Sequence, residues 1–299
     1  MSEKTDCLNI KMIVMDMDGT LLTSKQSISE NTMQVLMEAQ EKGIRIVLAS
    51  GRSYRTLLPY GAQLKMSMND GYFICVNGAG IMETKTMEYK VVRQLQKEEI
   101  MELFYAILPF EVEAMGVLDS TIYDYIPDSL REIKREYRAL HEIPDDVPWT
   151  GGTFSIITDQ RKGYSQIYEI QDFEEIPCAV NKICLAHLPD VLEPIHAELI
   201  KKYGDKYHFA RTSNQWIECS PAGVNKGTAI LNLAKNLGIE ADEIVVFGDG
   251  ENDLSMFRVV KYSVAMGNAM DSVKRAAYEV TYDNDSDGIG HFLKKHKVI

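Results

Sequence analysis

Two pairs of aspartates, each directly after an apolar stretch, are the residues of this chain best suited to do chemistry. The first pair, Asp16 and Asp18, follows the run Met12–Met15 and precedes Gly19 and Thr20. Alternate residues of a strand point to the same side, although a turn at Gly19 can redirect Asp18. Carboxylates held together repel each other, and a hard cation such as Mg²⁺ relieves that repulsion. The pair is also compatible with a strand that ends in an ordinary Asp-Gly turn.

The second pair, Asp249 and Asp253, also follows an apolar run, residues 243–247, and also lies among glycines. Residues spaced four apart share one face if a helix begins there, so both carboxylates can face one point. If the two apolar runs are neighbouring strands, the acids meet at the carboxyl edge of a parallel sheet and form an oxygen-ligand Mg²⁺ site. Lys226, at an expected helix start, supplies the positive charge that such a site needs.

The elements that must position these residues follow an α/β pattern. Ser27 or Ser29 is expected to cap a helix that ends at Gly43, and a polar Ser-Gly step at residues 50–51 follows the second strand. Buried strands are expected at residues 12–15, 44–49, 72–76, 243–247 and 262–266, and further helices at residues 54–65, 228–236, from 268 and from 290. Strands that alternate with helices in this way predict a parallel sheet.

Residues 85–211 break this alternation. They contain expected strands at residues 89–94, 154–158 and 182–186, amphipathic helices near residues 98–108 and 191–203, and a charged, proline-bearing middle at residues 127–148. Such α+β material between two α/β halves indicates a separate domain. We therefore expect a core domain formed by residues 1–84 and 212–299 and an inserted domain formed by residues 85–211.

The composition argues against several classes of protein. The formal net charge is -12, from 32 basic and 44 acidic residues, which disfavours nucleic acid or an anionic membrane as the main partner. No apolar run approaches the roughly 20 residues that span a bilayer, and residues 1–9 lack the apolar segment of a secretion signal. The five cysteines show no C-x-x-C spacing, so a cytoplasmic protein without disulfides is expected.

Four motifs together resemble the haloacid dehalogenase (HAD) superfamily of phosphotransferases. They occur in the family's order along nearly the whole chain, as Asp16-Met17-Asp18-Gly19-Thr20, Ser50-Gly51-Arg52, Lys226 and Gly248-Asp249-Gly250-Glu251-Asn252-Asp253. Asn77-Gly78-Ala79 and the position of the insert resemble the Cof-type phosphatases with a C2 (C2B-like) cap. The resemblance implies a Rossmann-like core with an inserted α+β cap that closes over the pocket. It also implies a Mg²⁺-dependent phosphatase that acts on a small phosphorylated metabolite, such as a sugar phosphate.

The same resemblance implies a role for each residue. Asp16 would be the nucleophile that forms an aspartyl phosphate, and Asp18 the general acid/base for the leaving alcohol and then for water. Mg²⁺ would be held by Asp16, the backbone oxygen of Asp18 and Asp249. Asp253 would act from further away, through a metal-bound water or by orienting Lys226. The phosphate would be bound by Ser50, Gly51, Lys226 and Asn252.

Each of these roles has a simpler alternative. Ser50 and Asn252 can be ordinary helix caps. Lys226 can be a solvated lysine on a helix. Arg52 is a candidate for reaching the substrate, although an exposed arginine is the default expectation. Function also has alternatives: a phosphomutase of the same superfamily, or a non-catalytic binding protein on this fold. The substrate is not identified; residues 115–125 of the insert are a candidate for contacting it. The oligomeric state is open, with a monomer slightly favoured.

Overall fold

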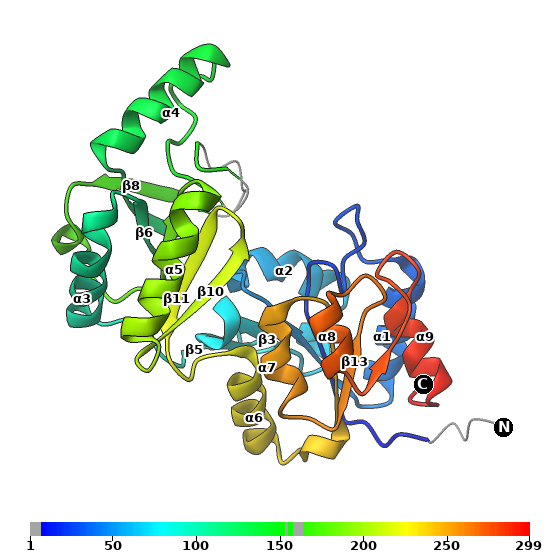
Figure 1. Ribbon diagram of the computed structural model, residues 1–299. Coiled ribbons are helices and arrows are strands. Elements are labelled where there is room, and N and C mark those ends of the chain that lie inside the picture. The colour runs from blue at the N-terminus through cyan, green and yellow to red at the C-terminus, as the bar shows by residue number, and fades with distance from the viewer. Residues whose placement is uncertain (1–6, 153–154, 158–163) are drawn as a thin grey trace. The chain divides into compact units, whose positions relative to one another are not determined.

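The computed structural model describes residues 7–152, 155–157 and 164–299, which form two compact units (Figure 1). One unit comprises Met1–Val92 and Val224–Ile299, and the other comprises Arg93–Gly223. Of the strand expected at residues 154–158, residues 155–157 are described, and they form only an isolated bridge between Ser155 and Gly152 instead of a strand. Residues 154 and 158 and part of the N-terminal segment considered for a secretion signal lie outside the described residues.

The limits of the inserted unit lie later in the chain than the expected residues 85 and 211. Strand β5 (Tyr89–Val91) pairs with β4 (Gly80–Glu83) and so belongs to the first unit. Strands β10 (Tyr207–Ser213) and β11 (Trp216–Pro221) pair with each other inside the second unit. The second unit therefore ends at Gly223, after β11, and the first unit resumes at Val224.

The first unit is built on an eight-stranded sheet with the order β14-β13-β12-β1-β2-β3-β4-β5. Its remaining strands are β1 (Met12–Met15), β2 (Arg45–Ala49), β3 (Tyr72–Cys75), β12 (Ile244–Gly248), β13 (Tyr262–Ala265) and β14 (Glu279–Val280). Strand β1 lies between β2 and β12, parallel to both. Every residue of β1 and β12 is buried, as expected for central parallel strands covered on both faces. The predicted α/β fold with a parallel sheet is confirmed for these strands.

Most helices of the first unit lie where the sequence pattern predicts a helix. They are α1 (Glu30–Glu41), α2 (Tyr54–Gln63), α6 (Lys226–Leu237), α7 (Leu254–Phe257), α8 (Asp271–Ala276) and α9 (Gly288–Lys295). Of the two candidate caps for α1, Ser29 is the one used: its side chain accepts a hydrogen bond from the Thr32 backbone N–H. Among the described residues, no helix combines the length and the apolar character needed to cross a membrane.

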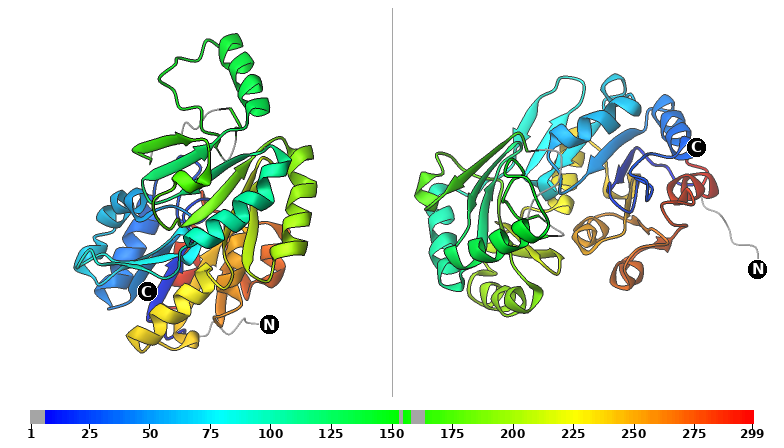
Figure 2. Two further views of the ribbon diagram at one scale, coloured as in Figure 1. Left: turned by 90° about the vertical axis from the view of Figure 1, so that its left-hand side faces the viewer. Right: turned by 90° about the horizontal axis from the view of Figure 1, so that it is seen from above.

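The second unit is a six-stranded sheet with helices on both faces. The sheet order is β10-β11-β9-β6-β7-β8, with β6 (Glu113–Val117), β7 (Thr121–Tyr125), β8 (Gln166–Ile170) and β9 (Lys182–Ala186). Helices α3 (Lys97–Ile107) and α5 (Pro189–Tyr203) pack side by side over one face of this sheet (Figure 2). Strand residues such as Ala114 and Leu185 line that face. Leu130 of α4 packs on the other face with Met115 and Cys184.

Helix α4 (Asp128–Leu140) was not predicted, because residues 127–148 have a charged and proline-bearing composition. Its buried residues are Leu130, Lys134 and Arg138, a regular helical spacing in which two of the three side chains are basic. Lys134 is buried because its Nζ contacts Glu113 Oε2 at 2.6 Å and the Trp149 carbonyl oxygen at 2.5 Å. A search for apolar periodicity overlooks a helix of this kind.

The backbone at Gly78 approaches the backbone at Asn225 so closely that only glycine fits there. Gly78 has a φ of +103°, and a Cβ there would lie 2.3 Å from the carbonyl oxygen of Asn225, the residue that caps α6. We expect Gly78→Ala to lower stability by about 2–4 kcal/mol, from the positive φ and the clash together. Differential scanning fluorimetry would detect this as a lower Tm.

Gly43→Ala is the matched control for this substitution. Gly43 also has a positive φ, +81°, but a Cβ there would meet nothing within 4 Å. Its expected cost is about 1 kcal/mol, from the backbone conformation alone. Equal losses of Tm in the two variants would contradict the importance of the contact with Asn225.

Candidate active site

Three strand ends and one helix start bring the predicted site residues to one edge of the large sheet. Asp16 follows β1, Ser50 follows β2 and Asp249 follows β12, and these strands are neighbours in the sheet. Lys226 is the first residue of α6, whose start is held by Asn225: the Asn225 side chain accepts from the Thr228 N–H at 2.9 Å. The carboxyl edge of a parallel sheet is the usual place for a binding site in such folds.

Lys226 is the buried cation of this site. Its Nζ lies 2.5 Å from Asp16 Oδ1 and 2.7 Å from Asp253 Oδ1, and the Lys226 side chain has no exposed surface. Burial favours the neutral amine, but the two carboxylates outweigh this and raise the pKa of Lys226 above its ordinary value. The alternative of a solvated helix lysine is therefore wrong.

Asp253 holds Lys226 and the turn after β12 together. One of its carboxylate oxygens accepts from Lys226, and the other accepts from the backbone N–H groups of Asp249 and Gly250, at 2.9 and 3.1 Å. A Cβ on Gly248 would lie only 2.6 Å from the Cβ of Asp253, so the turn packs closely. Both oxygens of Asp253 are thus engaged by donors, which suits a residue that orients Lys226.

Asp249 is positioned by the segment that follows β1. The Thr20 hydroxyl donates to Asp249 Oδ1 at 2.7 Å. Gly19 has a φ of +75°, and a Cβ there would lie 2.4 Å from Asp249 Oδ2, so any larger residue would collide with the carboxylate. The Asn268 side-chain amide donates to the Gly19 carbonyl oxygen at 2.8 Å. This chain of contacts fixes Asp249 facing Asp16.

Three acids lie close together at this edge. Asp16, Asp249 and Asp253 each offer a carboxylate oxygen within 4.8 Å of the others. Burial raises the pKa of Asp16 to about 7 and that of Asp249 to about 6, so ionising these groups is costly without a further positive charge. The donor set consists of carboxylate oxygens, the ligands that hard divalent cations prefer. The residues present therefore fit such a cation.

Asp18 is paired with Arg52 and is not one of the three clustered acids. Its two oxygens accept from Arg52, Oδ2 from Nε at 2.9 Å and Oδ1 from Nη2 at 2.5 Å, a bidentate ion pair. Arg52 also donates to Gln26 Oε1 at 3.0 Å. Asp16 thus pairs with Lys226 and Asp18 with Arg52, so Arg52 has a specific partner at the site.

The segments after β2 and β3 form the remaining part of the edge. Ser50 is buried, and its hydroxyl accepts from the Arg52 backbone N–H at 3.2 Å. The N-cap of α2 is Ser53, so the alternative of Ser50 as its cap is wrong. A hydroxyl that accepts can still donate its own hydrogen to a ligand.

Asn77 and Asn252 meet at the rim. The Asn252 amide donates to Asn77 Oδ1 at 3.4 Å, and the Asn77 backbone N–H donates to the Ser50 carbonyl oxygen at 2.9 Å. A Cβ on Gly51 would lie 3.3 Å from the Asn77 side chain. Through Asn77, Asn252 therefore lies near Ser50 and Gly51, the other residues expected to bind the phosphate. The Asn252 side chain is exposed.

Several residues of this edge were not assigned a role from the sequence. Thr20 was part of the first motif, and a threonine beside two acids is a signal that could have been used. Arg52 had been treated as an exposed arginine by default. Asn268 offers no local signal, because its partner Gly19 is 249 residues away in the chain.

Comparison with known proteins gives consistent matches. The sequence model of the haloacid dehalogenase-like hydrolases matches residues 13–293. The chain is similar to the 5-amino-6-(5-phospho-D-ribitylamino)uracil phosphatase YitU of Bacillus subtilis, with 24% identity over 290 residues, 95% of this chain and 97% of that protein. It is similar to the HMP-PP phosphatase of Serratia proteamaculans, with 25% identity over 289 residues, 95% of this chain and 94% of that protein.

The fold is also found in a crystal structure of a haloacid dehalogenase-like hydrolase from Bacteroides thetaiotaomicron. The two chains are 28% identical, and the match covers 97% of this chain and 100% of the other, with a TM-score of 0.74.

The raised pKa values predict that divalent cations bind more tightly at high pH. Burial raises the pKa of Asp16 to about 7 and that of Asp249 to about 6, against 3.8 for an ordinary aspartate. The folded protein holds these two protons more tightly than the unfolded chain does. The resulting stability is fully present below pH 3.8, and it is lost as the pH rises through about 6 and about 7, the raised pKa values of Asp249 and Asp16. A cation must displace the protons at about pH 5 and meets ionised carboxylates at about pH 8. We expect Mg²⁺ to raise the Tm more at about pH 8, measured by scanning fluorimetry after EDTA treatment.

Asp249→Asn, which removes one carboxylate, should lose most of this Tm increase. Asp242→Asn, an exposed aspartate of the same unit, should keep it. An equal or larger effect of Mg²⁺ at about pH 5 would contradict the assignment of Asp16 and Asp249 to the cation.

Proposed function

We propose that this chain, which belongs to the haloacid dehalogenase-like hydrolases, is a Mg²⁺-dependent phosphatase of a small phosphorylated metabolite. The observation that carries the proposal is the contact of 2.5 Å between the buried Lys226 ammonium and Asp16, at the carboxyl end of β1. Two similar proteins, from Bacillus subtilis and Serratia proteamaculans, bear the names of phosphatases, which supports the same reaction here.

Asp16 acts as the nucleophile. One of its carboxylate oxygens forms a bond to phosphorus while the bond from phosphorus to the substrate's alcohol oxygen breaks, which leaves an aspartyl phosphate. Lys226 is charged and buried beside Asp16, so it can offset the negative charge on the phosphoryl oxygens without reorganising. Ser50, the Gly51 N–H and Asn252 assist at the same oxygens.

Asp18 moves the protons. It gives a proton to the departing alcohol oxygen, and it then takes one from the water that attacks phosphorus and releases Asp16 with inorganic phosphate. For this, its bidentate contact with Arg52 has to open. Asp18 and Arg52 have side chains that are 52% and 30% exposed, so water can replace these hydrogen bonds at low cost.

Mg²⁺, when bound, supplies charge neutralisation at the phosphoryl oxygens. Asp16, Asp249 and the backbone oxygen of Asp18 would hold it. Asp253 keeps Lys226 in place rather than binding the cation directly, since both of its oxygens already accept hydrogen bonds. The second unit, Arg93–Gly223, is proposed to select the substrate.

Asp16→Asn should abolish turnover, because a neutral amide oxygen is not a nucleophile for phosphorus. We expect kcat for p-nitrophenyl phosphate in Mg²⁺ to fall by at least about 10⁴-fold, and the phosphoenzyme not to form. Asp242→Asn, in the same unit, should keep normal activity. Appreciable activity in Asp16→Asn would remove Asp16 as the nucleophile.

Asp18→Asn should separate the two half-reactions. A substrate with a good leaving group, such as p-nitrophenyl phosphate, needs little protonation, so a phosphoenzyme should form but break down slowly. Rapid-quench experiments would show a burst of p-nitrophenol followed by slow release of phosphate. Normal turnover would exclude the acid/base role. With a sugar phosphate as substrate, formation of an isomerised sugar phosphate without release of inorganic phosphate would indicate a phosphomutase.

A further inference from the structure

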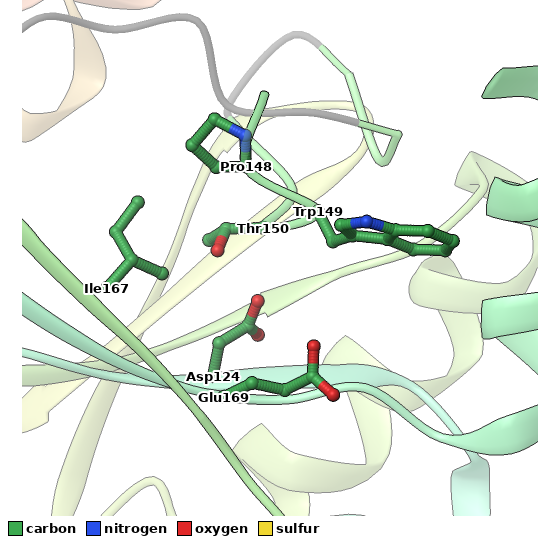
Figure 3. Close-up of a pocket in the computed structure, with 6 residues that line it drawn as sticks. All are labelled: Asp124, Pro148, Trp149, Thr150, Ile167 and Glu169. Carbon is green, nitrogen blue, oxygen red and sulfur yellow. The ribbon is translucent and has the colours of Figure 1, made fainter. Parts of the chain in front are cut away.

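The second unit contains a cavity that the proposed chemistry does not use. Its volume is about 210 Å³. It lies between one face of the paired strands β7 and β8 and the chain segment at residues 148–150 (Figure 3). The lining residues are Asp124, Pro148, Trp149, Thr150, Ile167 and Glu169. All six belong to the unit Arg93–Gly223, whereas Lys226 and the acids around it belong to the other unit.

Asp124 is an unsatisfied acceptor directed into this cavity. Its side chain is 1% exposed, and its Oδ1 has no hydrogen-bond partner among the described residues. Figure 3 shows the carboxyl group rising from β7 toward the space between Thr150 and Glu169. A buried acceptor without a donor is costly, so a ligand that brings a donor to Oδ1 is favoured.

The charged groups around the cavity are already paired with one another. Lys134 contacts Glu113 at 2.6 Å, and Arg131 contacts Glu169 at 2.7 Å. The guanidinium of Arg138 lies over the Trp149 ring, 4.6 Å from its centroid. Among the described residues, the basic side chains near the cavity are therefore already engaged by these partners.

Asp124 itself does not favour a cationic ligand. Burial raises the pKa of Asp124 well above its ordinary value, and the negative charge of the neighbouring Glu113 raises it further. Ionising this carboxyl inside the unit is therefore costly, whereas the buried Asp124 Oδ1 can accept a hydrogen bond from an uncharged donor. An uncharged ligand with hydrogen-bond donors is therefore the best match.

We propose that this cavity binds a small, uncharged molecule rich in hydroxyl groups, such as a polyol or a monosaccharide. One ligand hydroxyl donates to Asp124 Oδ1, and a second donates to the Thr150 hydroxyl oxygen, whose own hydrogen is directed to the Asp124 carboxyl. The carbon face of the ligand packs against Ile167 and Pro148. The site stands independently of the proposed phosphatase activity.

The experiment measures binding of D-glucose and meso-erythritol to the full chain by isothermal titration calorimetry. Saturable binding is expected with a Kd in the millimolar range, because the cavity takes only a small ligand. Ile167→Trp, at a half-buried position, should fill the cavity and raise the Kd at least about tenfold. Thr150→Val, which keeps the shape and removes the hydroxyl, should weaken binding in the same direction.

Tyr168→Trp is the matched control, because residue 168 is exposed on the same strand and its ring stacks on Tyr123, on the face opposite to Ile167. It should leave the Kd within about twofold of the unaltered protein. Three results would each overturn the proposal: no saturable binding of either polyol, unchanged binding in Ile167→Trp with a normal Tm, or binding of ethylammonium in place of the polyols.

Discussion

The buried ion group of Lys226, Asp16 and Asp253 is the interaction on which the first unit's site depends. It joins residues that lie 210 and 27 positions apart in the chain, so the two chain segments of this unit meet at one ammonium group. Removing one partner of such a buried pair typically costs about 3–5 kcal/mol, because the remaining charge is left without compensation. The same contact places a charged lysine beside the carboxylate proposed to attack phosphorus. Stability and reactivity therefore depend on the same few atoms.

This ion group forms only because backbone segments approach very closely around it. Strands β1, β2 and β12 are neighbours, which brings their carboxyl ends to one edge. Gly19 lies against Asp249, Gly78 against the N-cap of α6, and Gly248 against Asp253, each closer than a side chain would permit. Small residues at these contacts let the acids converge, and hydrogen bonds from Thr20 and from backbone N–H groups then hold them in place. The site is thus preorganised by packing before any ligand binds.

The second unit also contains a buried ion pair, which here holds a helix and a loop segment against the sheet. Glu113 and Lys134 are fully buried as an ion pair, and Lys134 also donates to the Trp149 carbonyl oxygen. This pair fastens α4 and the segment around Trp149 to the sheet face that α3 and α5 do not cover. Asp124 lies beside the pair with one oxygen unsatisfied, which is the origin of the cavity's preference for donors. A buried acid and base can therefore replace apolar packing, provided that each is paired.

Local patterns in the sequence were enough to predict the α/β core and the meeting of Asp16, Asp249 and Asp253, although they also placed Asp18 in this group. Apolar runs that end in aspartate and glycine mark buried strands and their turns, and the order of such strands implies a shared edge for Asp16 and Asp249. The pairing of Asp18 with Arg52, the burial of Lys226 and the support from Asn268 appear only after folding, because each depends on contacts between segments distant in the chain. Helix α4 escaped prediction for a related reason: the side chains on its buried face include Lys134 and Arg138, and whether a charge can be buried depends on a partner that sequence periodicity does not reveal.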